Sequence, residues 1–511
     1  MFVKLYTGAI SGIEAVEVSV EVNVASGGLG LFLVGLPDNT IKESEQRIQA
    51  AFENSGYRLT HKKTVVNLAP ADLRKEGSLY DLPIAVGILV ATEQLTTTLL
   101  DDSFFIGELS LDGTLRAVTG VLPLVAMAKE RGRRRVFLPA DNAAEGAIVE
   151  GIDIVGINNL TELCAILAGY SDYTPTPHIV ADNEVISDNP YTEDFADVKG
   201  QVAVKRALEI AAAGGHNVIM VGSPGSGKTM LARRMPTIMP PMTLDEALET
   251  TKIHSVAGNT GAHRGLMSCR PFRAPHHLTS EVALIGGGQS PQPGEVSLAH
   301  NGILFLDEMP EFGRNVLEVL RQPLEERHIT VSRAKYTVDY PANFTLVASM
   351  NPCPCGYHNH PTKECSCSTA AVHRYMARIS GPLMDRIDLH INVEPVAIGE
   401  LSANSPAESS AEIRRRVVAA RKIQTARFEG LDIHCNAMMN SAMLRRFAPL
   451  NSTCSALLER AMTQLNLSAR AYDRIIKVAR TIADLDNSDN IEPQHIAEAI
   501  GYRSLDREGV M

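Results

Sequence analysis

The sequence contains no tryptophan, and only 5% of its residues are aromatic; neither shortage excludes a fold or a function. It also lacks an apolar run near the roughly 18 residues that a membrane-spanning helix needs. Residues 1–6 do not have the basic-then-apolar form of a secretory signal. The chain also has no excess of basic residues, since its formal net charge is −11 at pH 7. This charge excludes a uniformly basic nucleic-acid binder, although a local basic patch can still contact phosphates. We therefore expect a cytoplasmic protein without a membrane partner.

The composition is that of an ordinary globular protein, with 45% hydrophobic and 21% charged residues. A chain of 511 residues is expected to form about three domains. Of its eight cysteines, four lie close together in the sequence. In an intracellular enzyme such a cluster indicates a metal site more than disulfides.

The strongest motif is a glycine-rich loop that matches the pattern G-x-x-x-x-G-K-[ST]. It lies between a short apolar run at 217–221 and the start of a helix, the order that a phosphate-binding loop requires. Glycines let backbone N–H groups turn toward an anion, and the helix N-terminus adds positive potential. Lys228 would reach the β- and γ-phosphates, and the Thr229 hydroxyl would bind Mg²⁺. The motif predicts a nucleoside-triphosphate site made of Gly222, Ser223, Pro224, Gly225, Ser226, Gly227, Lys228 and Thr229.

Two later apolar runs, each typical of a buried strand, end in polar residues. Residues 302–306 precede Asp307 and Glu308, and residues 344–350 precede Asn351. Buried parallel strands deliver such residues to a nucleotide crevice at their carboxyl ends. We expect Asp307 to hold Mg²⁺ and Glu308 to polarise the attacking water as general base. Asn351 would orient that water, although an asparagine after a strand is also a common turn residue.

The clustered cysteines form two C-x-C pairs, which are Cys353 with Cys355 and Cys365 with Cys367. Four thiolates can close a tetrahedral Zn²⁺ site, with His358 and His360 as substitute ligands in the same loop. Most structural zinc sites use C-x₂-C spacing, so a surface loop with reduced thiols stays an alternative. A site with four protein ligands leaves no position for water, so a metal here would be structural.

Residues 1 to about 170 alternate between strand and helix patterns. Residues 16–22 have the period two of a half-buried strand, and residues 82–91 are apolar all round, as in a buried helix. Residues 107–115 indicate a hairpin with Asp-Gly at its turn. This succession resembles the peptidase domain of the Lon proteases, a fold shared with the second domain of ribosomal protein S5. The serine and lysine of the Lon dyad fall on Asp81 and Leu122, and leucine cannot activate a hydroxyl. The resemblance implies a structural or binding module without peptidase activity.

The phosphate loop, the strand before Asp307, the strand before Asn351 and the helical end of the chain together resemble the AAA+ ATPases. More narrowly, residues 272–277, 351–356 and 380–388 are similar to the magnesium-chelatase ATPase subunit and to the ComM (YifB-type) family. The likeness to the latter covers essentially the whole chain. It implies ATP as the nucleotide and a ring whose active sites lie between subunits.

The resemblance also implies roles for two arginines. Arg386 would serve the γ-phosphate of a neighbouring subunit as arginine finger, with Arg378 as the alternative finger. The structural alternative for Arg386 is an intrachain salt bridge with Asp385 or Asp388. Arg470, near the start of a long helix, would reach the γ-phosphate from the lid as sensor 2, with Arg474 as its competitor.

Two segments distinguish this core from a generic one. Residues 278–300 are rich in glycine and proline, which predicts a mobile loop and resembles the helix-2 insert of chelatase and MCM-type ATPases. Residues 328–340 alternate as a hairpin that carries Arg333 and Lys335 at its turn and resembles the pre-sensor-1 hairpin facing the pore of such rings. Cations at a turn are usually just solvated. In a ring, however, they would line a channel with positive charge suited to a DNA backbone.

The sequence thus predicts an α/β protein with an AAA+ P-loop core and a helical lid, preceded by a Lon-like, ribosomal-S5-domain-2-like α+β domain. The expected boundaries are 1–172 for the first domain, 173–190 for a linker, 191–400 for the ATPase core and 401–511 for the lid. The family resemblance implies a hexameric DNA helicase that uses ATP and Mg²⁺ to branch-migrate recombination intermediates in natural transformation, and the cysteine pairs add structural zinc as a candidate metal. The alternative is a chelatase-like ATPase that remodels a protein partner. Absence of the first domain from the chelatase subunit would count against that alternative.

Overall fold

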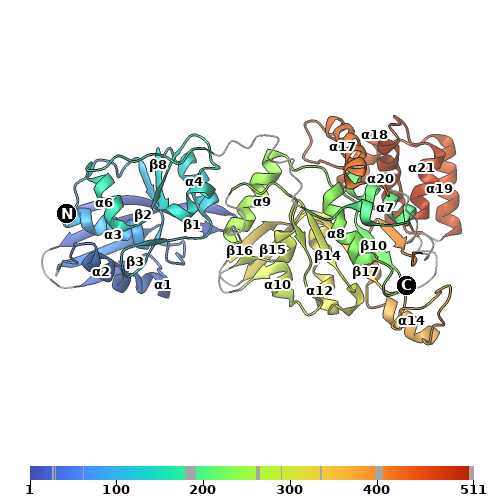
Figure 1. The fold of residues 1–511 in the computed structure, drawn as a ribbon, viewed down its shortest axis with the longest axis horizontal. Coiled ribbons are helices and arrows are strands. Elements are labelled where there is room, and N and C mark those ends of the chain that lie inside the picture. The colour runs from blue at the N-terminus through green and yellow to red at the C-terminus, as the bar shows by residue number, and fades with distance from the viewer. Residues whose placement is uncertain are drawn as a thin grey trace.

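The computed structural model describes residues 1–25, 28, 30–60, 62–178, 191–259, 265–288, 291–333, 336–396, 407–465, 467–503 and 505. Figure 1 shows an elongated molecule with an α/β domain at its N-terminal end and a helical region at the other. A sheet that carries the phosphate loop lies between them. Across the described part of the chain, no helix has the length and apolarity needed to span a bilayer.

The first domain is built on a four-stranded sheet of order β1-β2-β4-β3, in which β3 and β4 run parallel and the other pairs antiparallel. A parallel sheet β5-β8-β9 and a hairpin β6-β7 complete its strands. Its strands are β1 (Phe2–Ser11), β2 (Glu14–Ala25), β3 (Leu31–Val34), β4 (Lys63–Ala69), β5 (Ser103–Phe105), β6 (Glu108–Leu109), β7 (Leu115–Arg116), β8 (Arg135–Pro139) and β9 (Asp153–Ile157). Its helices are α1 (Asn39–Lys42), α2 (Ser44–Asn54), α3 (Asp81–Ala91), α4 (Val121–Glu130), α5 (Ala143–Gly146) and α6 (Leu160–Leu167).

The predicted elements of this domain are confirmed: the period-two strand is part of β2, the apolar helix is α3, and the Asp-Gly hairpin is β6-β7. Every residue of α3 is buried. The two positions to which the Lon resemblance assigns the dyad have structural contacts. The Asp81 carboxylate accepts a hydrogen bond from Arg47 Nε at 2.7 Å, and the Leu122 side chain is buried.

The start of the expected linker packs against the first domain. Tyr173 lies edge-on to Phe137 with ring centroids 6.2 Å apart, and the Thr176 N–H donates to the Ile154 carbonyl at 2.7 Å. Residues 173–178 therefore belong structurally with this domain, contrary to the expected boundary at 172. The rest of the expected linker, 179–190, lies outside the described residues.

The middle of the chain forms a five-stranded parallel sheet of order β11-β14-β17-β10-β18. Alternate side chains of β10 point to opposite faces, as a strand requires. Val218 and Met220 pack with the C-terminal helices, whereas Ile219 and Val221 pack in a separate core with β14 and β17. The strands are β10 (Val218–Val221), β11 (Phe272–Arg273), β14 (Ile303–Leu306), β17 (Thr345–Met350) and β18 (Leu389–Asn392). The helices around them are α7 (Val202–Gly214), α8 (Lys228–Ile238), α9 (Leu244–Val256), α12 (Arg314–Glu318), α13 (Arg321–Glu326), α14 (Thr369–Met376) and α15 (Gly381–Met384).

The two segments that set this core apart both contain regular structure. The predicted hairpin is β15 (His328–Arg333) paired with β16 (Tyr336–Pro341). The glycine-rich stretch before β14 was expected to be a loop, and that expectation is wrong for much of it. Its described residues form α10 (Glu281–Ile285), a short hairpin of β12 (Gly286–Gly287) with β13 (Gln292–Pro293), and α11 (Glu295–Leu298). The apolar residues Leu284 and Val296 of this insert are buried, and their burial offsets the entropy cost of ordering its glycines.

The C-terminal region is helical, as predicted. It consists of α17 (Ser410–Arg427), α18 (Ser441–Phe447), α19 (Ser452–Gln464), α20 (Ala469–Leu485) and α21 (Pro493–Gly501). The apolar faces of α17 and α20 pack on α7 and share one hydrophobic core with the β10 face of the sheet. The helical lid is therefore attached, through α7, to the face of the sheet that carries Val218 and Met220.

The first domain contacts the ATPase core through α4 and α9. The Gly120 N–H donates to the Ser255 carbonyl at 3.0 Å, and the Ser255 hydroxyl donates to the buried carboxylate of Glu145. The Glu145 carboxylate also accepts the Leu122 N–H at 2.9 Å. One carboxylate thus joins α4 of the first domain to α9 of the core.

Candidate active site

The glycine-rich loop joins the end of β10 to the start of α8. Gly227 stands immediately before α8 with φ +92°. This left-handed conformation is accessible to glycine at little cost, whereas side chains disfavour it. The predicted order of strand, loop and helix is confirmed.

Lys228 folds back over the loop. Its Nζ donates to the carbonyls of Gly222 at 2.7 Å and Ser223 at 3.0 Å, and lies 3.4 Å from Asn351 Oδ1. Burial lowers the pKa of Lys228, and the charges of Asp307 and Glu308 partly oppose that shift. The hydroxyls of Ser223 and Ser226 are buried without a hydrogen-bond partner among the described residues. Unpaired donors and a buried cation around one loop fit a phosphate group.

The loop meets the strand β14 at a hydroxyl–carboxylate contact. The Thr229 hydroxyl donates to Asp307 Oδ2 at 2.8 Å, and the Ser349 hydroxyl donates to Oδ1 of the same carboxylate. A hydroxyl and a carboxylate side by side are oxygen ligands of the kind that Mg²⁺ prefers, so these residues fit the ion. Ser349 was not among the predicted site residues. The parallel register pairs Leu306 with Ala348, so Asp307 and Ser349, the residues that follow them, lie side by side. Only the pairing of the two strands could have identified Ser349.

Glu308 follows Asp307 with φ +52°, and its backbone N–H donates to Ser349 Oγ at 3.3 Å. Its side chain is 58% exposed, and His277 Nδ1 lies 4.0 Å from its carboxylate. A solvent-facing carboxylate beside the phosphate loop can take a proton from water. His277 belongs to the motif 272–277 and had been given no role from sequence.

Arg386 lies far from the phosphate loop of its own chain. Its backbone carbonyl accepts Asn217 Nδ2 at 3.0 Å, and Asn217 precedes β10, whereas the phosphate loop follows β10. Residues 217–222 of an extended strand span about 16 Å at roughly 3.3 Å per residue. The guanidinium forms a salt bridge with Glu325, which corrects the expected partners Asp385 and Asp388. Arg378 pairs instead with Glu311 at 2.8 Å.

Both sensor-2 candidates lie at this same end of the sheet. Arg470 is 57% exposed and lies 3.8 Å from Asp385, and Arg474 forms a salt bridge with the buried Asp388. The Asp388 N–H donates to the Asn217 carbonyl at 3.0 Å. Within one chain, Arg470 therefore lies near the amino end of β10, and the phosphate loop follows the carboxyl end of that strand.

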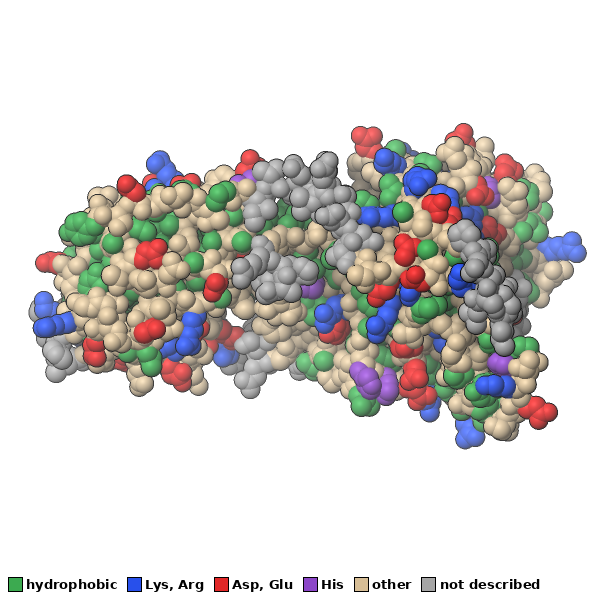
Figure 2. Space-filling model, in the orientation of Figure 1, with side chains coloured by type: hydrophobic (Ala, Val, Ile, Leu, Met, Phe, Trp, Pro, Cys, Tyr) green, Lys and Arg blue, Asp and Glu red, His purple; other side chains and the backbone are tan. Residues whose placement is uncertain are grey.

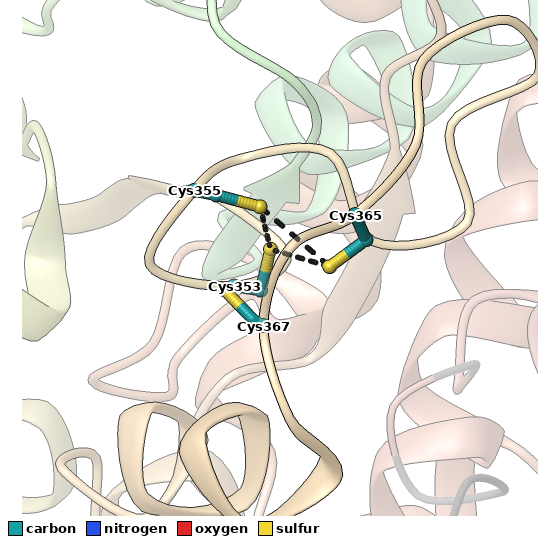
Figure 3. Close-up of side chains that lie close together, drawn as sticks. All are labelled: Cys353, Cys355, Cys365 and Cys367. Atoms are coloured by element: carbon teal, nitrogen blue, oxygen red, sulfur yellow. Dashed lines mark hydrogen bonds between the residues drawn. The ribbon is translucent and has the colours of Figure 1, made fainter.

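The four clustered cysteines converge. Cys353 Sγ lies 3.3 Å from Cys355 Sγ and 3.7 Å from Cys365 Sγ, and the last two sulfurs are 3.6 Å apart. All four ligand atoms, including that of Cys367, lie within 4.8 Å of one another (Figure 3). The Tyr357 backbone N–H and the Cys353 side chain lower the pKa of the Cys355 thiol to about 5. For Cys365 and Cys367 backbone hydrogen bonds lower the pKa, but desolvation and the nearby sulfurs outweigh them and raise it. Four close sulfurs fit a structural metal. His358 and His360 are not in this group.

The predicted DNA contacts are only partly described. Arg333 ends β15, but its side chain and the whole of Lys335 lie outside the described residues. On the face drawn in Figure 2, Lys and Arg side chains are interspersed with Asp and Glu. This mixture agrees with a net charge of −11, so a contact with DNA would have to come from a local group of basic residues.

Three family models match the chain. The model described as magnesium chelatase, subunit ChlI, matches residues 194–401, and the model of its C-terminal part matches 407–503. A third, described as subunit ChlI of Mg-chelatase, matches residues 20–142. A chelatase-subunit model thus also covers the first domain, so the expected absence of that domain from such subunits does not separate the two functions.

Bacterial proteins from several genera match nearly the full length of the chain. YifB of Escherichia coli K12 is 44% identical over 507 residues, which cover 98% of this chain and 97% of YifB. The competence protein ComM of Haemophilus influenzae is 43% identical over 504 residues, with the same two coverages. The magnesium-chelatase 38 kDa subunit of Cereibacter sphaeroides is 25% identical over 177 residues, or 31% of this chain and 52% of that subunit. With its phosphate loop and parallel sheet, the chain belongs to the magnesium-chelatase-like AAA+ ATPases of the ComM and YifB type.

Proposed function

We propose that this protein is an ATP-driven DNA motor that works in the cytoplasm as a homohexameric ring. Its task would be branch migration of recombination joint molecules during natural transformation. Membership of the family implies ATP hydrolysis with Mg²⁺. The competence name of a relative that is 43% identical over nearly its whole length supports a role in DNA uptake or integration.

In the proposed reaction the loop N–H groups and Lys228 bind the β- and γ-phosphates, and the Lys228 ammonium leaves the loop carbonyls to do so. Thr229 and Asp307 would hold Mg²⁺, and the bound ion would supply positive charge beside the phosphate oxygens. Glu308 accepts the proton of the attacking water, and the Asn351 amide orients that water toward the γ-phosphate. All of these residues follow the carboxyl ends of the parallel strands.

The observation that carries the ring is the position of Arg386. It lies at the amino end of β10, about 16 Å of strand from its own phosphate loop. Because an arginine side chain cannot cover that distance, Arg386 would act only on the nucleotide of another subunit. Arg470 lies at the same end and would serve that neighbouring site too. A head-to-tail contact of this kind repeats around a closed ring.

The hairpin β15-β16 is the proposed DNA contact, with Arg333 and Lys335 at its turn. It joins the core between α13 and β17, so it connects directly to the strand that precedes Asn351. A change of nucleotide state at Asn351 can therefore move the hairpin. For the four-cysteine cluster we propose zinc as the bound metal, because four sulfur ligands suit it.

The test is a fork- and Holliday-junction-migration assay with and without ATP, combined with ATPase rates in the presence of branched DNA. The matched pair of variants is Arg333→Ala with Lys335→Ala, against Arg445→Ala with Arg446→Ala on the exposed side of α18. We expect the first pair to lose migration and DNA stimulation while it keeps basal hydrolysis, and the second to behave as wild type. If DNA leaves the ATPase rate unchanged and a protein partner raises it, the chelatase-like alternative replaces this proposal.

A further inference from the structure

The cysteine cluster lies directly beside the phosphate loop. Gly356, one residue after Cys355, has φ +83°, and a Cβ built there would lie 2.5 Å from Pro224 Cδ and 2.7 Å from Pro224 Cγ. The space between the Gly356 backbone and the Pro224 ring is therefore too small for a methyl group. Because Pro224 is a rigid part of the phosphate loop, the position of Gly356 limits the shape that the phosphate loop can adopt.

The same loop holds Asn351. Cys353 is two residues after Asn351 and is completely buried. Asn351 Oδ1 in turn lies 3.4 Å from Lys228 Nζ. Beyond the last ligand, Cys367, Ser368 caps α14, whose C-terminal end is followed by Arg378. The cluster therefore stands at a junction of the phosphate loop, Asn351 and α14.

Apart from contacts that His360 makes with Tyr357 and with the backbone of Thr362 and Lys363, this loop has few internal bonds. Between β17 and α14 there is no helix or strand, and the described backbone hydrogen bonds inside it close two short turns, Gly356 to Cys353 and His360 to Tyr357. A stretch of this length without regular structure needs another source of order. A metal bound by the four cysteines would supply that order. The sulfur–sulfur separations of 3.3, 3.6 and 3.7 Å are longer than a disulfide bond. They lie near the roughly 3.8 Å between sulfurs of a tetrahedral zinc site.

We propose that zinc bound by Cys353, Cys355, Cys365 and Cys367 clamps this loop against Pro224, and so couples metal occupancy to nucleotide binding and to the position of Asn351. The inference rests on the proposed zinc and nucleotide sites, and it assigns the metal a role beyond local folding. Coupling between two binding sites is reciprocal. Metal loss should therefore weaken nucleotide binding, and bound nucleotide should slow metal loss.

The first experiment uses the full-length protein and measures zinc per chain, the dissociation constant of a fluorescent non-hydrolysable ATP analogue, and kcat. We expect about one zinc in wild type, and a loss of zinc in Cys353→Ser and in the less buried Cys367→Ser. Nucleotide affinity and kcat should each fall roughly tenfold or more, since misplacement by about 1 Å can cost that much. Cys269→Ser, at a cysteine outside the cluster, should match wild type. Thermal melts identify variants that merely fail to fold.

A second experiment separates the contact from the metal. Gly356→Ala leaves all four ligands in place but adds a methyl group against Pro224. It should keep its zinc and still lose nucleotide affinity. Gly132→Ala is the matched control, because Gly132 has a similar φ of +75° and no atom within 4 Å of its added Cβ. In wild type, the analogue should slow zinc release to a chelator.

The inference is overturned if purified protein holds no zinc, or if the metal-free variants and Gly356→Ala bind the analogue as tightly as wild type. The two measurements that decide it, zinc content and affinity for the analogue, need neither DNA nor hydrolysis. Failure of the DNA-motor proposal would therefore leave them intact, and their failure would leave DNA-stimulated hydrolysis untouched.

Discussion

Thr229 Oγ1 donates a hydrogen bond to Asp307 Oδ2 at 2.8 Å, across β17, which lies between the strands that precede the two residues. This contact joins the phosphate loop to the acidic strand end. In Thr229→Val the hydroxyl is lost at nearly constant volume, whereas Thr229→Ser keeps it. We expect kcat for ATP hydrolysis to fall at least about 100-fold in the valine variant, because metal-assisted charge stabilisation is worth several kcal/mol. The serine variant should stay near wild type. Equal rates in the two variants would contradict the assignment.

Glu308 is the proposed general base. Glu308→Gln keeps the shape of the side chain but removes the carboxylate that accepts a proton. The expected loss in kcat is about 10²- to 10⁴-fold with nucleotide affinity retained, measured by steady-state hydrolysis and analogue binding. Glu311→Gln, a change at the exposed partner of Arg378, serves as control. Wild-type hydrolysis in Glu308→Gln would remove Glu308 from the mechanism.

Arg386 is predicted to act between subunits, which a mixing experiment can detect. Arg386→Ala and Lys228→Ala should each lose about 10³-fold or more in kcat. In a 1:1 mixture, about a quarter of the head-to-tail interfaces combine an intact phosphate loop with an intact Arg386. Activity should therefore return after mixing. If Arg386 acts in its own chain, the mixture stays inactive. An isolated single subunit that hydrolyses ATP as fast as the assembly would also refute this scheme.

Local sequence patterns predicted most elements of the ATPase core. The phosphate loop, Asp307 and the two strands that end in polar residues were predictable, because buried parallel strands are short apolar runs whose carboxyl ends converge. Ser349 was not found, because its role depends on the register of β14 against β17 and not on any motif.

The position of the lid could not be read from sequence. The helix α20 was predicted at nearly its true start, but its apolar face packs on α7 behind the sheet. Arg470 therefore lies beside Asp385 and not beside its own phosphate loop. The direction in which an amphipathic helix packs is a tertiary property, and periodicity shows only that one face is buried. In the same way, the order in the glycine-rich insert comes from side chains that it buries against the core.

Asp388 connects the lid to the sheet. Its carboxylate accepts the Asn217 N–H at 3.0 Å and pairs with Arg474 of α20. Burial alone would raise the pKa of Asp388, but Arg474 and His216 hold it well below its usual range. Asp388→Ala leaves a half-buried arginine unpaired and should lower the free energy of unfolding by about 3–5 kcal/mol, as for other broken buried pairs. Urea denaturation measures the change. Asp473→Ala removes a less buried carboxylate of α20 that accepts the Ser441 hydroxyl, and should cost far less. A similar cost in both variants would show that the pairing with Arg474 carries no special weight.

Because Glu145 is buried at the contact between the first domain and the core, we expect the stability of the protein to depend on its protonation and so on pH. Burial raises its pKa, although hydrogen bonds from Ser255 and from the Leu122 N–H oppose the shift. Because the folded-state pKa is raised, the protonated form favours the folded protein. Its contribution to stability is then complete below the unfolded pKa of about 4.3 and is lost as pH rises through the folded pKa. In Glu145→Gln this loss is absent. The difference in urea midpoint between Glu145→Gln and wild type should therefore rise in favour of the variant as pH increases from about 4.3 and then level off. The exposed change Glu150→Gln should show no such trend. A difference that stays constant with pH would mean that Glu145 has the same proton affinity in the folded and unfolded chain.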